Sequence, residues 1–366
     1  MSFGARALIR LGALTHNLSV IKERAPAAKI TAVVKANAYG HGLTTVAAAL
    51  ADVDSYGVAR LPEAIELRES GQTKPVILLS GVFTANELAA AARHECELVV
   101  HTEQQIELLE ARSDLRLTVW LKLDTGMHRL GFPVTRAVEL IDRLRACSAV
   151  AELRLMTHLA NADDPRDQKT DSQLAAFADV AESFDGDISI ANSGGIFGWP
   201  TAVRPPYVAA GASIWIRPGI ALYGVSPFPE LNGADLGLQP AMQFESRLIA
   251  VKDIRAGDSV GYGGRWRADK DTTIGIISAG YGDGLTGYLA SGTPVMVNGN
   301  IVPLVGAVSM DMAAVDLGPN SDDHSGDPVL IWGEELPVED IARRAGILAY
   351  QLVCGVMHRE NSSISR

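Results

Sequence analysis

Short runs of Val, Ile and Leu recur along the first two thirds of the chain, and most are followed by a stretch with helical periodicity. These runs occupy residues 29–36, 55–59, 75–80, 97–101, 116–124, 153–158, 187–191 and 213–222. Segments rich in Ala and Leu lie between them, at residues 43–51, 61–70, 85–93, 103–112 and 173–183. The pattern predicts eight strands that alternate with amphipathic helices.

The alternation of strands and helices predicts an α/β fold with a parallel sheet. Eight strand-helix repeats match the number in a (β/α)8 barrel, and nearly continuous apolar strands are typical of a parallel sheet that is buried on both faces. A doubly wound sheet would show the same alternation. Our prediction for this part of the chain is a TIM-like (β/α)8 barrel.

The pattern changes after residue 228. Strand-like runs follow one another without intervening helices and are separated by Gly, Asp and Asn turns, at residues 243–254, 272–278, 294–297, 301–305 and 328–332. A last helical segment covers residues 338–346. We therefore predict a barrel domain at residues 11–228 and a mainly β domain at residues 229–366. An N-terminal strand at residues 1–10 is expected to join the β domain.

The composition is that of a folded globular protein, and the charge disfavours nucleic acid as a partner. Hydrophobic residues make up 47% of the chain and charged residues 20%, both near globular averages. There are 32 Lys and Arg residues against 43 Asp and Glu residues, a net charge of −11. A general binding surface for a phosphate backbone is not expected on such a chain.

Cysteine use and the N-terminal sequence predict a cytoplasmic protein without a metal site. Cys96, Cys147 and Cys354 lie far apart, which predicts neither a disulfide framework nor a thiolate zinc site. Arg6 and Arg10 interrupt the apolar residues at the N-terminus before a signal peptide could form. No uninterrupted apolar run reaches the ~18 residues of a membrane span, so we expect no association with a membrane.

Polar residues follow the ends of several predicted strands: Lys35, Lys122, Arg129, His158, Ser193 and Arg217. A single lysine at a strand end more often just reaches solvent. In a barrel, however, the carboxyl ends of all strands meet at one face, where active sites lie. The order of these residues along the chain therefore predicts that they converge on one mouth.

The loops after the seventh and eighth strands predict an anion site. They read ANSGG at residues 191–195 and RPGI at residues 217–220. Small residues let backbone N–H groups approach an anion closely, and the Ser193 hydroxyl adds a donor. Barrels commonly bind phosphate at these two loops. Together with a lysine that can form a Schiff base, the loops indicate a phosphorylated aldehyde cofactor.

Residues 32–42, AVVKANAYGHG, resemble the pyridoxal-phosphate attachment segment of alanine racemases without a break. The similarity continues in order through residues 122–131, 191–193, 217–224, 261–263, 280–284 and 309–311. It therefore extends over both predicted domains. The resemblance implies pyridoxal 5′-phosphate as cofactor and an amino-acid racemase that interconverts L- and D-alanine, supplying D-alanine for peptidoglycan.

The resemblance also implies a role for each matching position. Lys35 would carry the cofactor and act as one catalytic base, and Tyr262 would be the second base. Arg217 would face the pyridine nitrogen, and His158 would link Arg217 to Tyr262 by hydrogen bonds. The residues that would hold the phosphate are Tyr39, Ser193, Gly219, Ile220 and Tyr350. Those that would contact the substrate carboxylate or line its entrance are Arg129, Met310 and Tyr281.

General chemistry agrees with these implied roles. Racemisation removes a proton from one face of Cα and delivers another to the opposite face, so two bases at different positions are required. A guanidinium is always charged, so Arg217 would keep the pyridine nitrogen unprotonated and would limit the lifetime of the carbanion. The resemblance further implies a carbamylated Lys122 that orients Arg129, and a homodimer in which Tyr262 reaches the lysine of the other subunit.

The sequence departs from the family pattern at two positions, and two other functions compete with racemisation. Ala307 stands where relatives commonly have arginine, and Gln351 replaces a usual glutamate; the proposed chemistry needs neither group. The first alternative is a barrel-type pyridoxal-phosphate decarboxylase, which would need an acidic partner for the pyridine nitrogen in place of Arg217. The second is a non-catalytic cofactor carrier, which would be a single barrel without the β domain that holds Tyr262.

Overall fold

The computed structural model describes residues 3–356 and 363–365, and the chain divides into two compact units. The barrel unit comprises residues 17–38 and 42–222. The β unit comprises the described parts of residues 1–16, 39–41 and 223–366. Within the described residues, no helix combines the length and the apolar character that crossing a membrane requires.

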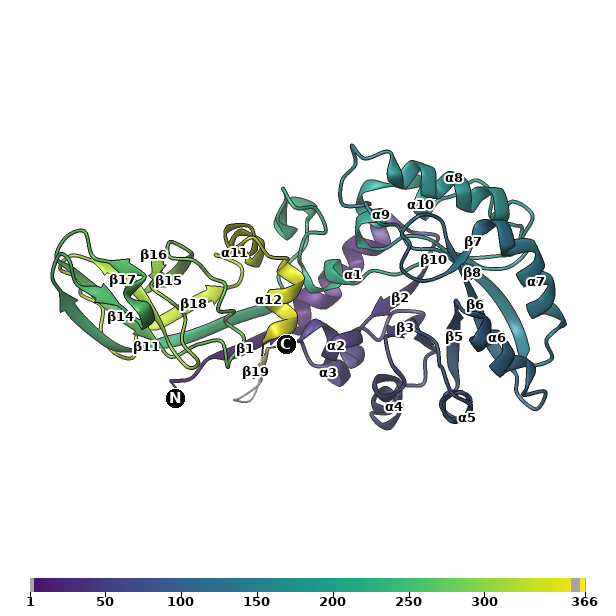
Figure 1. The fold of residues 1–366 in the computed structure, drawn as a ribbon, viewed down its shortest axis with the longest axis horizontal. Helices are drawn as coiled ribbons and strands as arrows, with labels where there is room; N and C mark the ends of the chain where they lie inside the picture. The colour runs from purple at the N-terminus through teal and green to yellow at the C-terminus, as the bar shows by residue number, and fades with distance from the viewer. Residues whose placement is uncertain (1–2, 357–362, 366) are drawn as a thin grey trace. The chain divides into compact units, whose positions relative to one another are not determined.

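Eight parallel strands of the barrel unit close into a ring (Figure 1). They are β2 (Lys29–Val33), β3 (Ser55–Val58), β4 (Val76–Leu78), β5 (Cys96–Val100), β6 (Leu117–Asp124), β8 (Val150–Met156), β9 (Ile188–Ser189) and β10 (Ile214–Ile216). Each strand pairs in parallel with the next, and β10 pairs with β2. This closure confirms the predicted (β/α)8 barrel over the doubly wound sheet, whose edge strands do not pair.

Helices follow the barrel strands, and those predicted from the sequence are present. The helices of this part of the chain are α1 (Leu11–Arg24), α3 (Leu43–Ala49), α4 (Leu61–Glu69), α5 (Ala85–Arg93), α6 (Glu103–Glu110), α7 (Ala137–Ala146), α8 (Lys169–Ala181), α9 (Ser193–Gly198) and α10 (Pro200–Val203). Threonines begin two of them: the Thr84 hydroxyl accepts the Glu87 N–H, and the Thr102 hydroxyl accepts the Gln105 N–H. The short strand β7 (Phe132–Pro133) pairs with the end of β6.

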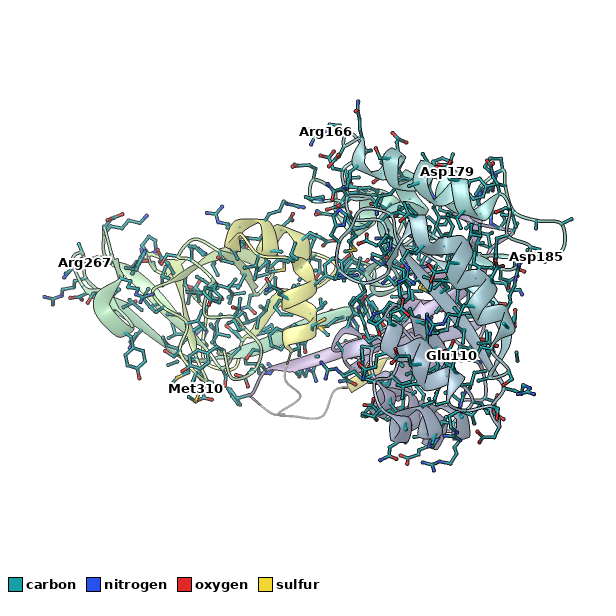
Figure 2. All side chains as sticks on the ribbon, turned by 45° about the vertical axis from the view of Figure 1, so that its right-hand side comes forward. Glu110, Arg166, Asp179, Asp185, Arg267 and Met310 are labelled. Atoms are coloured by element: carbon teal, nitrogen blue, oxygen red, sulfur yellow. The ribbon has the colours of Figure 1, made fainter. Side chains whose placement is uncertain are left out.

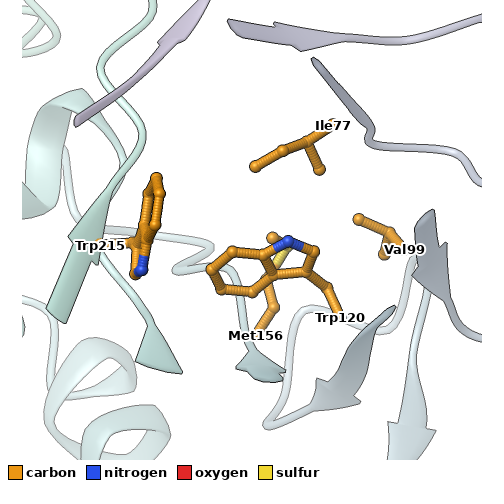
Figure 3. Close-up of a cluster of buried hydrophobic side chains, with 5 residues drawn as sticks. All are labelled: Ile77, Val99, Trp120, Met156 and Trp215. Carbon is orange, nitrogen blue, oxygen red and sulfur yellow. The ribbon is translucent and has the colours of Figure 1, made fainter. Parts of the chain in front are cut away.

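Large side chains from five different strands fill the middle of the barrel. They are Ile77, Val99, Trp120, Met156 and Trp215, all at most 4% exposed (Figure 3). Because side chains two positions apart in a strand share a face, the next inward positions toward the carboxyl ends fall on Lys122, His158 and Arg217. The strand period therefore places these three polar residues one layer above an apolar plug.

The β unit is built around a second closed sheet, which is antiparallel. Its ring consists of β11 (Met242–Ile254), β14 (Thr272–Ile277), β17 (Ala313–Gly318), β16 (Asn300–Val305), β15 (Pro294–Val297) and β18 (Pro328–Trp332). Outside the ring, β1 (Arg6–Arg10) pairs antiparallel with β11 and parallel with β19 (Ser363–Ser365). The unit also contains the hairpin β12 (Ser259–Val260) and β13 (Trp266–Arg267), and the helices α11 (Val338–Ala345) and α12 (Ala349–Gly355). The predicted mainly β character is confirmed.

Candidate active site

Lys35 follows β2 and opens a left-handed turn, α2 (Lys35–Tyr39). The φ angles of Ala36, Asn37, Ala38 and Tyr39 are 55°, 52°, 51° and 53°. A left-handed conformation costs a non-glycine residue roughly 1–2 kcal/mol, so four in succession persist only when the surroundings impose them. The Asn37 side chain contributes: its Oδ1 accepts the N–H of Leu43 at 2.8 Å. Such strain is concentrated at functional sites.

Four cationic side chains influence one another at the carboxyl end of the barrel. Lys122 and Arg217 are buried, 7% and 4% exposed. Burial, followed by the charges of Arg217, Arg129 and Lys35, lowers the pKa of Lys122 from 10.5 to about 7. The amine is therefore partly neutral at neutral pH. Burial also lowers the pKa of Arg217 to about 9, so its guanidinium remains charged there.

Arg217 is fixed by hydrogen bonds to residues at the carboxyl ends of two strands, β8 and β9. Its Nη1 donates to the Ser189 hydroxyl, and its Nη2 donates to the Thr157 carbonyl at 2.6 Å. Nη2 also lies 3.3 Å from Nδ1 of His158, which must be the acceptor because a guanidinium only donates. Burial and then the charge of Arg217 lower the pKa of His158 well below its usual value, so the imidazole is neutral. His158 thus bonds to Arg217, while the predicted continuation of this link to Tyr262 stays a prediction.

Ser193 joins the two loops that the sequence marks as an anion site. It is 4% exposed, and its Oγ accepts the N–H groups of Gly219 at 3.0 Å and of Ala221 at 3.3 Å. With both lone pairs accepting, the hydroxyl proton can donate to an oxygen of a bound anion. Gly194 fits close to the chain, since a Cβ there would lie 2.9 Å from the Ala162 carbonyl carbon. Ile220 is also buried beside Gly219.

Tyr39 and Tyr350, both predicted phosphate ligands, belong to one aromatic cluster of the β unit. The Tyr39 ring stacks on Tyr223 with centroids 4.7 Å apart and lies 6.1 Å from the Tyr350 ring. Burial, followed by the neighbouring Tyr350, raises the pKa of Tyr39. Its phenol therefore keeps its proton and is a hydrogen-bond donor at neutral pH.

Tyr262, Tyr281 and Met310 are exposed residues of the β unit, 77%, 49% and 52% exposed respectively. The Tyr281 N–H donates to the Ser309 carbonyl at 3.0 Å, so the loops that carry Tyr281 and Met310 are joined. The Met310 side chain extends outward from the unit (Figure 2). Two of these exposed side chains, Tyr281 and Met310, therefore lie on neighbouring loops of the β unit.

The structure brings the predicted site residues together in two groups. In the barrel unit, charge interactions or hydrogen bonds connect Lys35, Lys122, Arg129, His158 and Arg217, and separately Ser193 with Gly219. In the β unit, Tyr39 contacts Tyr350, and the segments of Tyr281 and Met310 pair; the loop of Tyr262 belongs to the same unit.

Polar residues that the sequence pattern does not single out support these groups. Gln173 on α8 donates to the Thr125 hydroxyl and to the His158 carbonyl, and accepts the Ala160 N–H. It is completely buried. Its position on the apolar face of a predicted helix is the one signal that could have identified it. Glu63 on α4 is a second such residue, since its carboxylate accepts the Ala36 N–H next to Lys35.

Comparisons with known proteins agree with this geometry. The alanine racemase N-terminal domain family matches residues 9–227, and the alanine racemase C-terminal domain family matches residues 241–364. The alanine racemase of Shewanella denitrificans is 50% identical over 354 residues, covering 95% of both chains. The chain belongs to the alanine racemase family. This membership favours racemisation over the decarboxylase and carrier alternatives.

Solved structures of the alanine racemase family share the whole fold. The crystal structure of the biosynthetic alanine racemase from Pseudomonas aeruginosa superposes with a TM-score of 0.94 at 41% identity, and 100% of each chain is covered. The alanine racemase from Bartonella henselae, solved with covalently bound pyridoxal phosphate, has a TM-score of 0.87 at 28% identity and 99% coverage of both chains. Both domains of the racemase fold are therefore present.

Proposed function

We propose that this protein is a pyridoxal-phosphate-dependent racemase that interconverts L- and D-alanine and supplies D-alanine for peptidoglycan. The observation that carries the proposal is the buried charged Arg217 in the same barrel mouth as Lys35, in a chain of the alanine racemase family. A decarboxylase site would require an acidic group in place of this arginine.

The residues of the barrel mouth fit pyridoxal phosphate. Lys35 lies at a strand end and can attach the aldehyde, and Arg217 offers a charged donor for a ring nitrogen. The Ser193 hydroxyl and the loop of Gly219 and Ile220 would bind phosphate oxygens, and Tyr39 and Tyr350 would add phenolic donors. When bound, the cofactor supplies an electron sink that makes the α-proton of the amino acid acidic.

The chain's own residues then move the protons. Lys35 would take or return a proton at one face of Cα, and Tyr262 would do so at the opposite face. Arg217 would hold the ring nitrogen unprotonated, and neutral His158 would keep Arg217 oriented through the 3.3 Å hydrogen bond and extend the hydrogen bonding to Tyr262. Arg129 would bind the substrate carboxylate, while Tyr281 and Met310 would limit the size of its side chain.

Lys122 would serve as a carbamate. A neutral amine attacks CO2 and releases a proton, and the lowered pKa of Lys122 provides that neutral amine near pH 7. The product is an anion beside three cations. It would orient Arg129 and relieve the repulsion within the cationic group.

We further propose that two copies of the chain form the active enzyme in the cytoplasm. Each site would take Lys35 from one subunit and Tyr262 from the other, which the large exposure of Tyr262 supports. Residues 11–228 would form the cofactor-binding domain and residues 229–366 the β domain, together with residues 1–10; the pairing of β1 with β11 supports this assignment. The few, widely spaced cysteines Cys96, Cys147 and Cys354 agree with a reducing compartment.

The direct test is to incubate the purified protein, loaded with pyridoxal phosphate, with L-alanine and to measure D-alanine by chiral chromatography. We expect racemisation to an equal mixture of L- and D-alanine. Leucine should be racemised much more slowly, because even one extra methylene in a tight pocket can separate two substrates by ~1–3 kcal/mol in transition-state binding. A protein that releases CO2 from amino acids, or leaves L-alanine unchanged, would contradict the proposal.

A further inference from the structure

Three successive barrel helices carry a side chain that caps their own first turn. Glu63, Glu87 and Gln105 are each the third residue of α4, α5 and α6. Glu63 Oε2 accepts the N–H groups of Ala59 and Arg60 at 2.8 and 3.0 Å. The equivalent bonds are from Phe83 N–H to Glu87 Oε2 at 2.8 Å, and from His101 N–H to Gln105 Oε1 at 2.8 Å.

This capping needs one oxygen and no charge. Gln105 performs it with a single amide oxygen, which accepts both the His101 and the Thr102 N–H groups. An amide at the third helical position is therefore sufficient to satisfy the donors that precede the helix.

Glu63 differs because its second oxygen reaches another strand end. Glu63 Oε1 accepts the N–H of Ala36 at 2.7 Å, across 27 residues of sequence. Ala36 directly follows Lys35 and is the first of the four left-handed residues. The bond therefore holds the peptide group that joins Lys35 to the strained turn.

We propose that Glu63 is a positioning residue for Lys35, acting through the Ala36 N–H. Alanine has no preference for left-handed φ, so the Lys35–Ala36 peptide requires an external acceptor to keep its orientation. A carboxylate is a stronger acceptor of a backbone N–H than a neutral amide. The inference rests on the proposed function insofar as Lys35 is the lysine that carries the cofactor.

The test compares Glu63→Gln with the matched control Glu87→Gln. In Glu63→Gln the one amide oxygen can cap α4, as Gln105 caps α6, but the NH2 group then faces the Ala36 N–H and cannot accept it. Both variants remove one negative charge from the third position of a barrel helix. They differ in the bond from the Ala36 N–H, which only Glu63→Gln loses.

We expect Glu63→Gln to bind pyridoxal phosphate about 10- to 100-fold more weakly, the range for loss of a hydrogen bond to a charged group. The visible absorbance during dialysis measures this retention. The variant's kcat should fall while its KM for alanine changes less, and Glu87→Gln should match the unaltered protein. Thermal unfolding of the two cofactor-free variants should be alike.

Equal cofactor retention and kcat in the two variants would overturn the role of Glu63. The role is also contradicted if Glu63→Gln merely lowers the unfolding temperature and leaves retention and kcat unchanged in the folded protein. If borohydride fixes the cofactor of the unaltered protein to another lysine, the proposed function fails as well. If borohydride traps the cofactor on Lys35 but the two variants have equal cofactor retention and kcat, only the positioning role of Glu63 is contradicted.

Discussion

Replacing Lys122 with methionine should stabilise the cofactor-free protein at neutral and mildly acidic pH. The ammonium group is buried beside Arg217 and is also repelled by Arg129 and Lys35. Methionine has a similar length and carries no charge, so it removes both the burial penalty and the repulsion.

The magnitude follows from the pKa of Lys122, which falls from 10.5 to about 7. At ~1.4 kcal/mol per pH unit, the charged amine destabilises the fold by up to about 5 kcal/mol. Below about pH 7 the amine is protonated in the folded and unfolded chains, so the full penalty applies. Between about pH 7 and pH 10.5 the unfolded chain binds more protons, so the stability of the unaltered protein rises with pH.

The assay is denaturant unfolding of the cofactor-free proteins in CO2-free buffers from about pH 6 to about pH 10, the range in which the linkage acts. The free energy of unfolding of Lys122→Met should exceed that of the unaltered protein most at the acidic end, and the difference should shrink as the pH rises. Lys252→Met, at an exposed position of β11, is the control and should show no such trend. A difference that is independent of pH, or a destabilised Lys122→Met at pH 6, would refute the reasoning.

Three further predictions concern the loops and the two bases. Ser193→Ala leaves the buried N–H groups of Gly219 and Ala221 without their acceptor, so the free energy of unfolding should fall by about 1–3 kcal/mol. The variant should also retain the cofactor less well, because one donor to the phosphate is lost. An unchanged free energy of unfolding would contradict the role of these two hydrogen bonds. Tyr262→Phe should slow α-proton exchange of L-alanine in D2O far more than that of D-alanine, and equal slowing would exclude a one-sided base. Inactive Lys35→Ala mixed with inactive Tyr262→Phe should regain part of the activity, because one site of a mixed dimer has both bases; a mixture that stays inactive after proven subunit exchange excludes a shared site.

The barrel could be predicted from the sequence because its strands are buried on both faces. All eight predicted runs overlap a barrel strand, although β9 is only two residues long. The sequence pattern does not predict helix α1 because its buried face includes Asn17, which is completely buried and donates to the Leu222 carbonyl at 3.0 Å. It does not predict strand β17 because that sequence, Ala-Ala-Val-Asp-Leu-Gly, has few β-branched residues.

The residue types of the site could be predicted, but their local geometry could not. Lys35 was identifiable from its place after an apolar strand and from its motif. The left-handed turn that follows it was not, since Ala36 and Ala38 have no preference for positive φ and the conformation depends on tertiary bonds. Glu63 has the same sequence signature as Glu87, and only the fold reveals that its second oxygen reaches Ala36.

The identity of the lysine that carries the cofactor tests the central claim most directly. Lys35 and Lys122 interact in the same barrel mouth. A Schiff base forms from a neutral amine, so the pKa of about 7 would make Lys122 the better candidate if pKa alone decided. Borohydride reduction of the purified protein loaded with pyridoxal phosphate, followed by peptide mass spectrometry, distinguishes the two. We expect the pyridoxyl group on Lys35 alone, in the peptide that contains the left-handed turn. Recovery of the group on Lys122, or on any other lysine, would contradict the account.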